Sequence, residues 1–244
     1  MVDVLNKLKK IFMADKVMPR GKEWPDELQG VPVDEHSGVL PNDWVPAEEL
    51  APIDQDPGYL EHSAEAVGYG NRELQWNIYR SIANYIPEGD SVLDFGCARG
   101  DFKLFHATDF KFDIDYIGID MNENLINAGK KVYEDKVDIR LQDWFSLPKD
   151  LKQDWSINIG SCNLRYDADI KTSDNDYLQN TIRTMLQHAD KGAVILLTSS
   201  VTDIDDGLIN YDPGLIFNWA QKEFGNVALD HTFSNDIFIL VIYK

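Results

Sequence analysis

From about residue 70 onward, short apolar runs of strand length alternate with stretches of helical periodicity. The strand candidates are Ser91–Phe95, Tyr116–Ile119, Val137–Leu141, Ser156–Gly160 and Ala193–Thr198. The helix candidates between them are Phe102–Thr108, Glu123–Tyr133 and Tyr177–His188. Alternation of this kind produces right-handed βαβ crossovers and a parallel sheet with helices on both faces. The sequence therefore predicts a doubly wound α/β fold.

Both ends of this region extend the pattern. Before the first strand, a helical stripe recurs every four residues at Leu74, Ile78, Ile82 and Ile86. After the last crossover, a helical segment, Leu215–Phe224, precedes two strand-like runs, Val227–Phe233 and Ile237–Tyr243. The three residues between these runs are a hairpin length. We therefore expect a seven-stranded, mostly parallel sheet that ends in a C-terminal antiparallel hairpin.

The first 65 residues differ in composition from the rest of the chain. Residues 1–22 are basic and carry apolar side chains at helical spacing, which predicts a short amphipathic helix. Residues 23–65 contain no Lys or Arg, many acidic residues and six prolines, which is typical of an extended, irregular arm. We expect two units: this arm, 1–65, and a globular domain, 66–244. The helix is expected to pack on its own domain; a membrane surface, a protein partner or self-association are the alternatives.

The net charge of −19 disfavours one class of substrate. A negative field repels phosphate backbones, so we expect no affinity for duplex DNA. Two cysteines are too few for a disulfide framework, and no apolar run approaches the ~20 residues that span a bilayer. The N-terminus also lacks the apolar centre of a signal peptide. We therefore expect a cytoplasmic protein without a membrane span.

The turn after the first predicted strand carries the strongest chemical signal. Its small residues, Gly96, Ala98 and Gly100, stand at positions i, i+2 and i+4, and let the backbone approach a ligand closely. Dinucleotide sites instead place glycines at i, i+2 and i+5. Here the i+5 position is Asp101, whose charge would repel a pyrophosphate. Asp94, at the strand end, is a second carboxylate beside the turn, and it favours a cationic ligand over a phosphate.

Acidic residues also end the next two predicted strands. Asp120, which follows the second strand, can accept hydrogen bonds from both hydroxyls of a ribose. Asp143, after the third strand and beside Gln142 and Trp144, can accept from the exocyclic amine of an adenine while an apolar side chain stacks on the ring. Three acids in series, one per strand, predict a nucleoside-containing ligand.

The run Val92–Phe102 resembles the first motif of the class I S-adenosylmethionine-dependent methyltransferases. Asp120 and Asp143 are similar to that family's second-strand and adenine-side acids, and the terminal hairpin matches its strand order. The resemblance covers roughly residues 70–244, and Ala98 stands where many members have glycine. It implies S-adenosylmethionine as cofactor, with Gly96, Ala98 and Gly100 along its methionine part. The implied cofactor site is Arg72, Asp94, Gly96, Ala98, Gly100, Asp120, Met121, Gln142, Asp143 and Trp144.

The resemblance also sets expectations about the reaction. In this family the methyl group is transferred by in-line displacement, and the segment after the fourth strand lines the reaction centre. Asn163 and Tyr166 in that segment are the candidates for contact with the acceptor. The segment lacks the Asp-Pro-Pro-Tyr, Asn-Pro-Pro-Tyr and Pro-Cys signatures of base-methylating enzymes. We therefore expect a small-molecule or protein acceptor, and the sequence identifies no catalytic base. A compact, acidic protein of this kind is also typical of bacteriophages.

Other interpretations stay open at this point. The chain can be a non-catalytic docking module that retains the fold, with the N-terminal arm as its working part. An aminopropyl transferase on the same fold is a second alternative, although Arg165 places a positive charge where a polyamine would bind. Arg72 can equally be a surface residue at a helix start. The histidines are scattered without metal-ligand spacing, so we expect no metal site.

Overall fold

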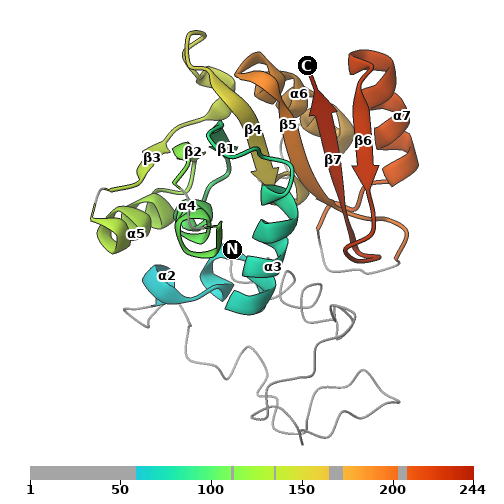
Figure 1. The fold of residues 1–244 in the computed structure, drawn as a ribbon. Helices are drawn as coiled ribbons and strands as arrows, with labels where there is room; N and C mark the ends of the chain where they lie inside the picture. Colours follow the sequence, from blue (N-terminus) through green and yellow to red (C-terminus); the bar gives the residue numbers. More distant parts are fainter. Residues whose placement is uncertain (1–58, 111–112, 135, 165–172, 203–207) are drawn as a thin grey trace, which may run out of the picture.

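A computed structural model describes residues 59–110, 113–134, 136–164, 173–202 and 208–244 (Figure 1). The predicted amphipathic helix of residues 1–22 and the arm up to residue 58 lie outside the described residues. The described part is a seven-stranded sheet with helices on both faces, as Figure 1 shows. The predicted α/β class, strand number and terminal hairpin are confirmed.

The sheet has the strand order β3-β2-β1-β4-β5-β7-β6. Its strands are β1 (Ser91–Phe95), β2 (Asp115–Asp120), β3 (Asp138–Leu141), β4 (Gln153–Ile159), β5 (Ala189–Thr198), β6 (Val227–Asp230) and β7 (Ile237–Tyr243). The first five strands pair in parallel, whereas β7 is antiparallel to both β5 and β6. Strand β7 therefore lies between β5 and β6, so the hairpin inserts into the sheet.

Helices cover the sheet in two layers, each with its own apolar core. The main helices are α2 (Tyr59–His62), α3 (Arg72–Ala83), α4 (Asp101–Phe105), α5 (Glu123–Tyr133), α6 (Asp174–Gln187) and α7 (Pro213–Phe224). Apolar residues of α3, α4 and α5 pack on one face of the sheet, and those of α6 and α7 pack on the other. Among the described residues, no helix is long and apolar enough to cross a membrane.

Strand β5 from Ala193 to Leu197 and strand β7 from Ile237 to Ile242 are apolar at every position, and both of their faces are buried. In β7, for example, Ile239 belongs to the core under α3 and α4, whereas the next residue, Leu240, belongs to the core under α6 and α7. Successive side chains of a strand point to opposite faces of the sheet. When helices cover both faces, apolar and polar residues therefore do not alternate along the strand. This explains the continuous apolar runs of the sequence.

Element bounds differ from the sequence prediction at several ends. Strand β5 begins at Ala189, four residues before the predicted start, because Ala189 pairs with Gln153 before a bulge in the β4–β5 ladder. Helix α6 begins at Asp174, where the Ser173 side chain caps it, instead of at Tyr177. The predicted helix Phe102–Thr108 is the short α4 followed by a π-helical turn, His106–Phe110.

Residues 59–65 are the described part of the predicted N-terminal arm, and they contact the globular domain. Glu61 of α2 forms an ion pair with Lys131 of α5 at 2.6 Å. The backbone carbonyl of His62 accepts a hydrogen bond from Arg72, and Ala64 is buried in the core. This short segment therefore packs on the helical layer formed by α3 and α5.

Helix α5 packs closely on the turn between β1 and α4 because it carries a glycine at the contact. A Cβ atom placed on Gly129 would lie 2.4 Å from the backbone carbonyl oxygen of Arg99. That distance is far below van der Waals contact, and backbone atoms cannot move aside as a flexible side chain can. Gly129 is therefore required by packing, although glycine lowers helix propensity.

We predict that Gly129→Ala lowers the stability of the protein. Alanine improves the intrinsic helix propensity by roughly 1 kcal/mol, but overpacking against a fixed backbone typically costs about 1–3 kcal/mol and displaces the turn. Chemical denaturation followed by circular dichroism measures the change. Asn127→Ala, at an exposed position of the same helix, is the matched control and should be neutral or stabilising. A Gly129→Ala variant as stable as the control would contradict this packing argument.

Candidate cofactor site at the carboxyl end of the sheet

The predicted site residues converge at the carboxyl ends of β1, β2 and β3. Strands β2 and β4 flank β1 in the sheet. From β1 the chain first builds the sheet to one side, through β2 and β3, and then to the other side, through β4 and β5, so the strand order reverses between β1 and β4. Open α/β sheets bind ligands at such a switch point, outside the carboxyl ends of the strands. The turn from Gly96 to Gly100, called here the glycine turn, covers this position.

The glycine turn requires its small residues for both conformation and space. Gly96, Ala98 and Gly100 all have positive φ angles, of 81°, 51° and 82°. A Cβ atom on Gly96 would lie 2.4 Å from Oγ of Ser161, which follows β4. Ala98 adopts the left-handed conformation at a cost of roughly 1–2 kcal/mol relative to glycine. The turn therefore keeps the backbone close to the neighbouring strands.

Asp120 ties the glycine turn to the end of β2. Its Oδ2 accepts a hydrogen bond from the backbone N–H of Ala98 at 2.8 Å, and its Oδ1 accepts one from Asn122 N–H at 2.7 Å. Burial raises the pKa of the Asp120 carboxyl, while these backbone donors oppose the shift. Each carboxylate oxygen can accept more than one hydrogen bond, so Asp120 retains acceptor capacity toward a ligand.

Asp94 places a second carboxyl group beside the turn. It is 3% exposed, and its Oδ2 accepts a hydrogen bond from the Tyr116 hydroxyl at 2.7 Å. Its Oδ1 is buried and has no hydrogen-bond partner in the structure. Burial raises the pKa of Asp94 to about 7, and the neighbouring Asp120 charge adds to the shift. The buried Asp94 and the partly buried Asp120, both with raised pKa values, form a region that a cation would stabilise.

The end of β3 is arranged around Asp143, with one change from the prediction. Its Oδ1 accepts a hydrogen bond from Phe145 N–H at 3.0 Å, and the adjacent Gln142 N–H donates to the Asp120 carbonyl at 2.9 Å. The predicted stacking residue, Trp144, is only 1% exposed, and its ring packs near Phe95 and Tyr177 in the core. Trp144 is therefore a core residue in this structure.

Two other apolar side chains are exposed at the same edge. Met121, which follows β2, is 43% exposed, and Phe145 is 50% exposed. Met121 is one of the predicted residues, whereas Phe145 was missed because the sequence does not distinguish which of two adjacent aromatic residues faces the core. The Gln142 side chain donates to Ser146 Oγ at 2.9 Å and stays within its own turn.

Arg72, the predicted residue at the start of α3, is held by protein groups in this structure. Its guanidinium donates to the Asp101 carboxylate at 3.1 Å, to Gln75 Oε1 at 2.7 Å and to the His62 carbonyl at 2.7 Å. Its side chain is 42% exposed. Asp101 directly follows the glycine turn, so the hydrogen bond from Arg72 to Asp101 places Arg72 next to that turn.

The segment after β4 is fixed to β1 and β5. Asn158 Nδ2 and Ser161 Oγ both donate to the carbonyl of Phe95, at 2.9 and 3.2 Å. Asn163, a predicted acceptor residue, is 1% exposed, and its Oδ1 accepts from Thr198 N–H at 3.1 Å. Its Nδ2 is buried without a hydrogen-bond partner. Tyr166, the other acceptor candidate, lies outside the described residues.

Asn158 and Ser161 were missed in the sequence analysis, although a signal exists. Asn158 lies between two isoleucines of β4 and is completely buried. A polar side chain in such a position normally has a specific hydrogen-bonding role. Within the described ranges, no group of three His, Cys, Asp or Glu side chains is placed to hold a metal ion.

Comparisons with known proteins bear on the family and the fold of the chain. The sequence profile of a family described as "Methyltransferase domain" matches residues 86–224. No curated protein sequence matches the chain significantly. The expectation of a bacteriophage source is not supported by these comparisons.

Two solved structures illustrate the similarity of the fold. One is a SAM-dependent methyltransferase from Archaeoglobus fulgidus, with 19% identity and a TM-score of 0.52, covering 72% of this chain and 95% of that chain. Another is a TehB-like SAM-dependent methyltransferase from Corynebacterium glutamicum, with 16% identity and a TM-score of 0.51, covering 69% of this chain and 87% of that chain. The profile match spans more than half of the sequence and includes the glycine turn, Asp120 and Asp143. The chain therefore belongs to the methyltransferase domain family, on the Rossmann-like fold that the resemblance predicted.

Proposed function

We propose that this protein binds S-adenosylmethionine at the carboxyl ends of β1, β2 and β3, and that it transfers the methyl group to a small-molecule or protein acceptor. The observation that carries the proposal is the pair of carboxyl groups on the strand side of the glycine turn, the buried Asp94 and the partly buried Asp120. This arrangement suits a ligand with a positive charge and a ribose better than a dinucleotide phosphate.

The residues present fit the parts of this cofactor. The left-handed turn at Gly96, Ala98 and Gly100 would let the backbone lie close to the methionine part, and the absence of a side chain on Gly96 makes room for Ser161. Asp120 has acceptor capacity for ribose hydroxyls, and Asp94 Oδ1 is a buried acceptor without a partner. Asp143 would accept from the adenine amine, with Met121 and Phe145 as the exposed apolar side chains nearby.

The protein contributes orientation and electrostatics to the reaction. When bound, S-adenosylmethionine supplies an activated methyl group that an acceptor takes by in-line displacement. The carboxylates of Asp94 and Asp120 stabilise positive charge, and holding two reactants in line contributes up to ~7–11 kcal/mol. The segment Ser161–Asn163, fixed to β1 and β5, shapes the acceptor side. We assign no general base.

A non-catalytic docking module that retains the fold is the second candidate, and cofactor binding without methyl transfer would favour it; the site geometry argues only against a module that has lost its ligand. A module that no longer binds a cofactor has no use for two incompletely neutralised carboxyl groups beside a strained turn. Each of these features costs stability. Their joint presence supports a protein that still binds a ligand there.

We predict that Asp120→Ala weakens the binding of S-adenosylmethionine about 10- to 100-fold, because each lost hydrogen bond to a charged acceptor costs roughly 1.5–3 kcal/mol. Isothermal titration calorimetry measures the dissociation constant. Asp138→Ala is the matched control, because Asp138 is an exposed carboxylate on the neighbouring strand that pairs only with Arg140 among the described contacts. A folded Asp120→Ala protein with an unchanged dissociation constant would remove Asp120 from the site.

We predict that cofactor affinity rises with pH through about 7. Asp94 has a pKa raised to about 7, so its proton must leave before the carboxylate can stabilise a cationic ligand. Affinity should therefore increase by up to about tenfold per pH unit below 7 and level off above it. Calorimetry between pH 5.5 and 8.5 measures this profile. The Asp94→Asn variant should lose this pH dependence, and an identical profile in both proteins would contradict the assignment.

The same carboxyl group predicts the pH dependence of stability without ligand. The folded-state pKa of Asp94 lies above its unfolded value, so the carboxyl group lowers stability progressively as pH rises from about 4 to about 7. Thermal melts should therefore show Asp94→Asn gaining stability over the wild type between pH 5 and pH 8. A constant difference between the two proteins would argue against a buried, titrating Asp94.

We predict that duplex DNA is not the acceptor. The net charge of −19 opposes approach to a phosphate backbone, and reaching a base in a duplex requires flipping it out. Transfer of a labelled methyl group is measured in parallel on duplex DNA, structured RNA, cell protein and a small-metabolite extract at low salt. Label should appear in the protein or metabolite fraction. Saturable labelling of duplex DNA alone would overturn this prediction.

A further inference from the structure

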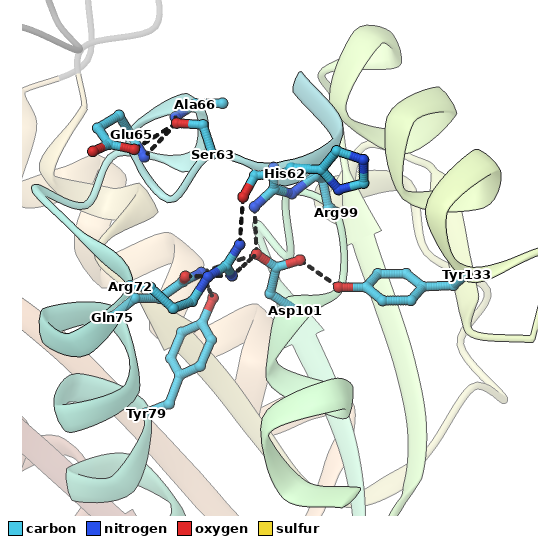
Figure 2. A network of polar contacts seen from close by, with 10 residues as sticks. All are labelled: His62, Ser63, Glu65, Ala66, Arg72, Gln75, Tyr79, Arg99, Asp101 and Tyr133. Carbon is cyan, nitrogen blue, oxygen red and sulfur yellow. Dashed lines mark hydrogen bonds and ion pairs between the residues drawn. The ribbon is translucent and has the colours of Figure 1, made fainter. Parts of the chain in front are cut away.

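The carboxylate of Asp101 lies at the centre of a buried polar network next to the glycine turn (Figure 2). Its Oδ2 accepts hydrogen bonds from Arg99 at 2.6 Å, from Gln75 at 3.0 Å and from Arg72 at 3.1 Å. Its Oδ1 accepts one from the Tyr133 hydroxyl at 2.5 Å. The donors come from α3, from the turn itself and from the end of α5. Asp101 therefore joins three separate elements directly behind the turn.

The charges of this network hold the glycine turn and Asp101 together. The Arg99 side chain is completely buried and that of Asp101 is 3% exposed, so neither ion is screened by water. Burial alone would raise the pKa of Asp101, but Arg99 and the other donors hold it below its usual range, so the carboxylate stays ionised. Breaking a buried pair of this kind leaves an uncompensated charge. The position of Arg99, within the glycine turn, is thereby coupled to Asp101.

Arg72 extends the network to the N-terminal segment. One guanidinium nitrogen, Nη1, donates to Asp101, and the other, Nη2, donates to the backbone carbonyl of His62 at 2.7 Å. His62 ends α2, which is held on α5 by the ion pair between Glu61 and Lys131. Figure 2 shows Arg72 between the His62 carbonyl and the Asp101 carboxylate. A single side chain thus contacts both α2 and the residue that follows the glycine turn.

We propose that Asp101 is a positioning residue for the glycine turn, and that Arg72 links this turn to the docking of α2 on the domain. When α2 is docked, the His62 carbonyl orients the guanidinium of Arg72 toward Asp101, and the network fixes the turn. When α2 is displaced, one of the three acceptors of Arg72 is lost and the turn is less restrained. Because the proposed cofactor binds at this turn, docking of α2 and cofactor affinity are coupled, and such coupling is reciprocal. The cofactor part of this inference rests on the proposed function.

Four variants of the full-length protein test the link, one of which, Arg72→Lys, is a conservative rescue. Arg72→Gln removes the charge that spans the two elements. Lys131→Ala weakens the attachment of α2 at a site away from the glycine turn, because the Lys131 side chain, 72% exposed, pairs with Glu61. Lys136→Ala is the matched control, since it removes an equally exposed lysine that pairs with Glu134.

Two measurements are made on each variant. Hydrogen–deuterium exchange of the ligand-free protein should be faster at the amides of Gly96–Gly100 in Arg72→Gln and in Lys131→Ala, with exchange in β5 unchanged. Calorimetry should show S-adenosylmethionine binding weakened about three- to tenfold in both variants, and unchanged in Lys136→Ala. Arg72→Lys should restore part of the affinity, because a lysine keeps the charge but reaches only one acceptor.

The outcomes separate this inference from the proposed function. Unchanged exchange of the glycine turn in both Arg72→Gln and Lys131→Ala would overturn the link, whatever ligand binds. Weaker binding in Arg72→Gln alone, without faster exchange, would instead mean that Arg72 acts by direct contact with the ligand. If the wild type does not bind S-adenosylmethionine, the proposed function fails while the exchange experiment still tests the positioning role.

Discussion

The arrangement of the site depends on one interaction, the hydrogen bond from the Ala98 N–H to the Asp120 carboxylate. It joins the turn after β1 to the end of β2 and holds Ala98 in a left-handed conformation that an alanine otherwise avoids. The close approach of Gly96 to Ser161 and of Gly129 to Arg99 depends on the turn staying in that position. Without this hydrogen bond, the Gly96 and Cys97 N–H groups would still donate to the Ile119 carbonyl, but the middle of the turn at Ala98 would lose its tie to β2.

Charge is distributed unequally on the two sides of this turn. Asp94 and Asp120 lie on the strand side, where burial raises the pKa of both carboxyl groups. Arg72 and Arg99 lie behind the turn and outnumber the single carboxylate of Asp101 that they share. The site therefore presents negative charge at the strand ends and a net positive charge behind the turn. A zwitterionic ligand with a cationic centre suits this polarity better than a polyphosphate does.

The sequence predicted the architecture well because periodicity and turn residues are local signals. The bounds of β1, α5 and β7 match their predicted ranges, and the two runs of the terminal hairpin are confirmed, although β6 ends at Asp230 instead of the predicted Phe233. Side-chain orientation at the site was harder to predict. Trp144 and Phe145 are adjacent aromatic residues, and only the three-dimensional packing shows that the first is buried and the second exposed. The role of Asp101 was also missed, because its donors Arg72, Gln75 and Tyr133 come together only through the packing of α3 and α5 on the turn.

The central claim is that the glycine turn and the acids that end β1, β2 and β3 form one cofactor site. A crystal structure of the protein grown with S-adenosylmethionine tests it most directly. The structure predicts the ligand at the carboxyl ends of these strands, with its ribose hydroxyls within hydrogen-bonding distance of Asp120 and its adenine beside Asp143 and Phe145. Ligand bound elsewhere, or no ligand at a concentration that saturates the crystal, would contradict the assignment of this site.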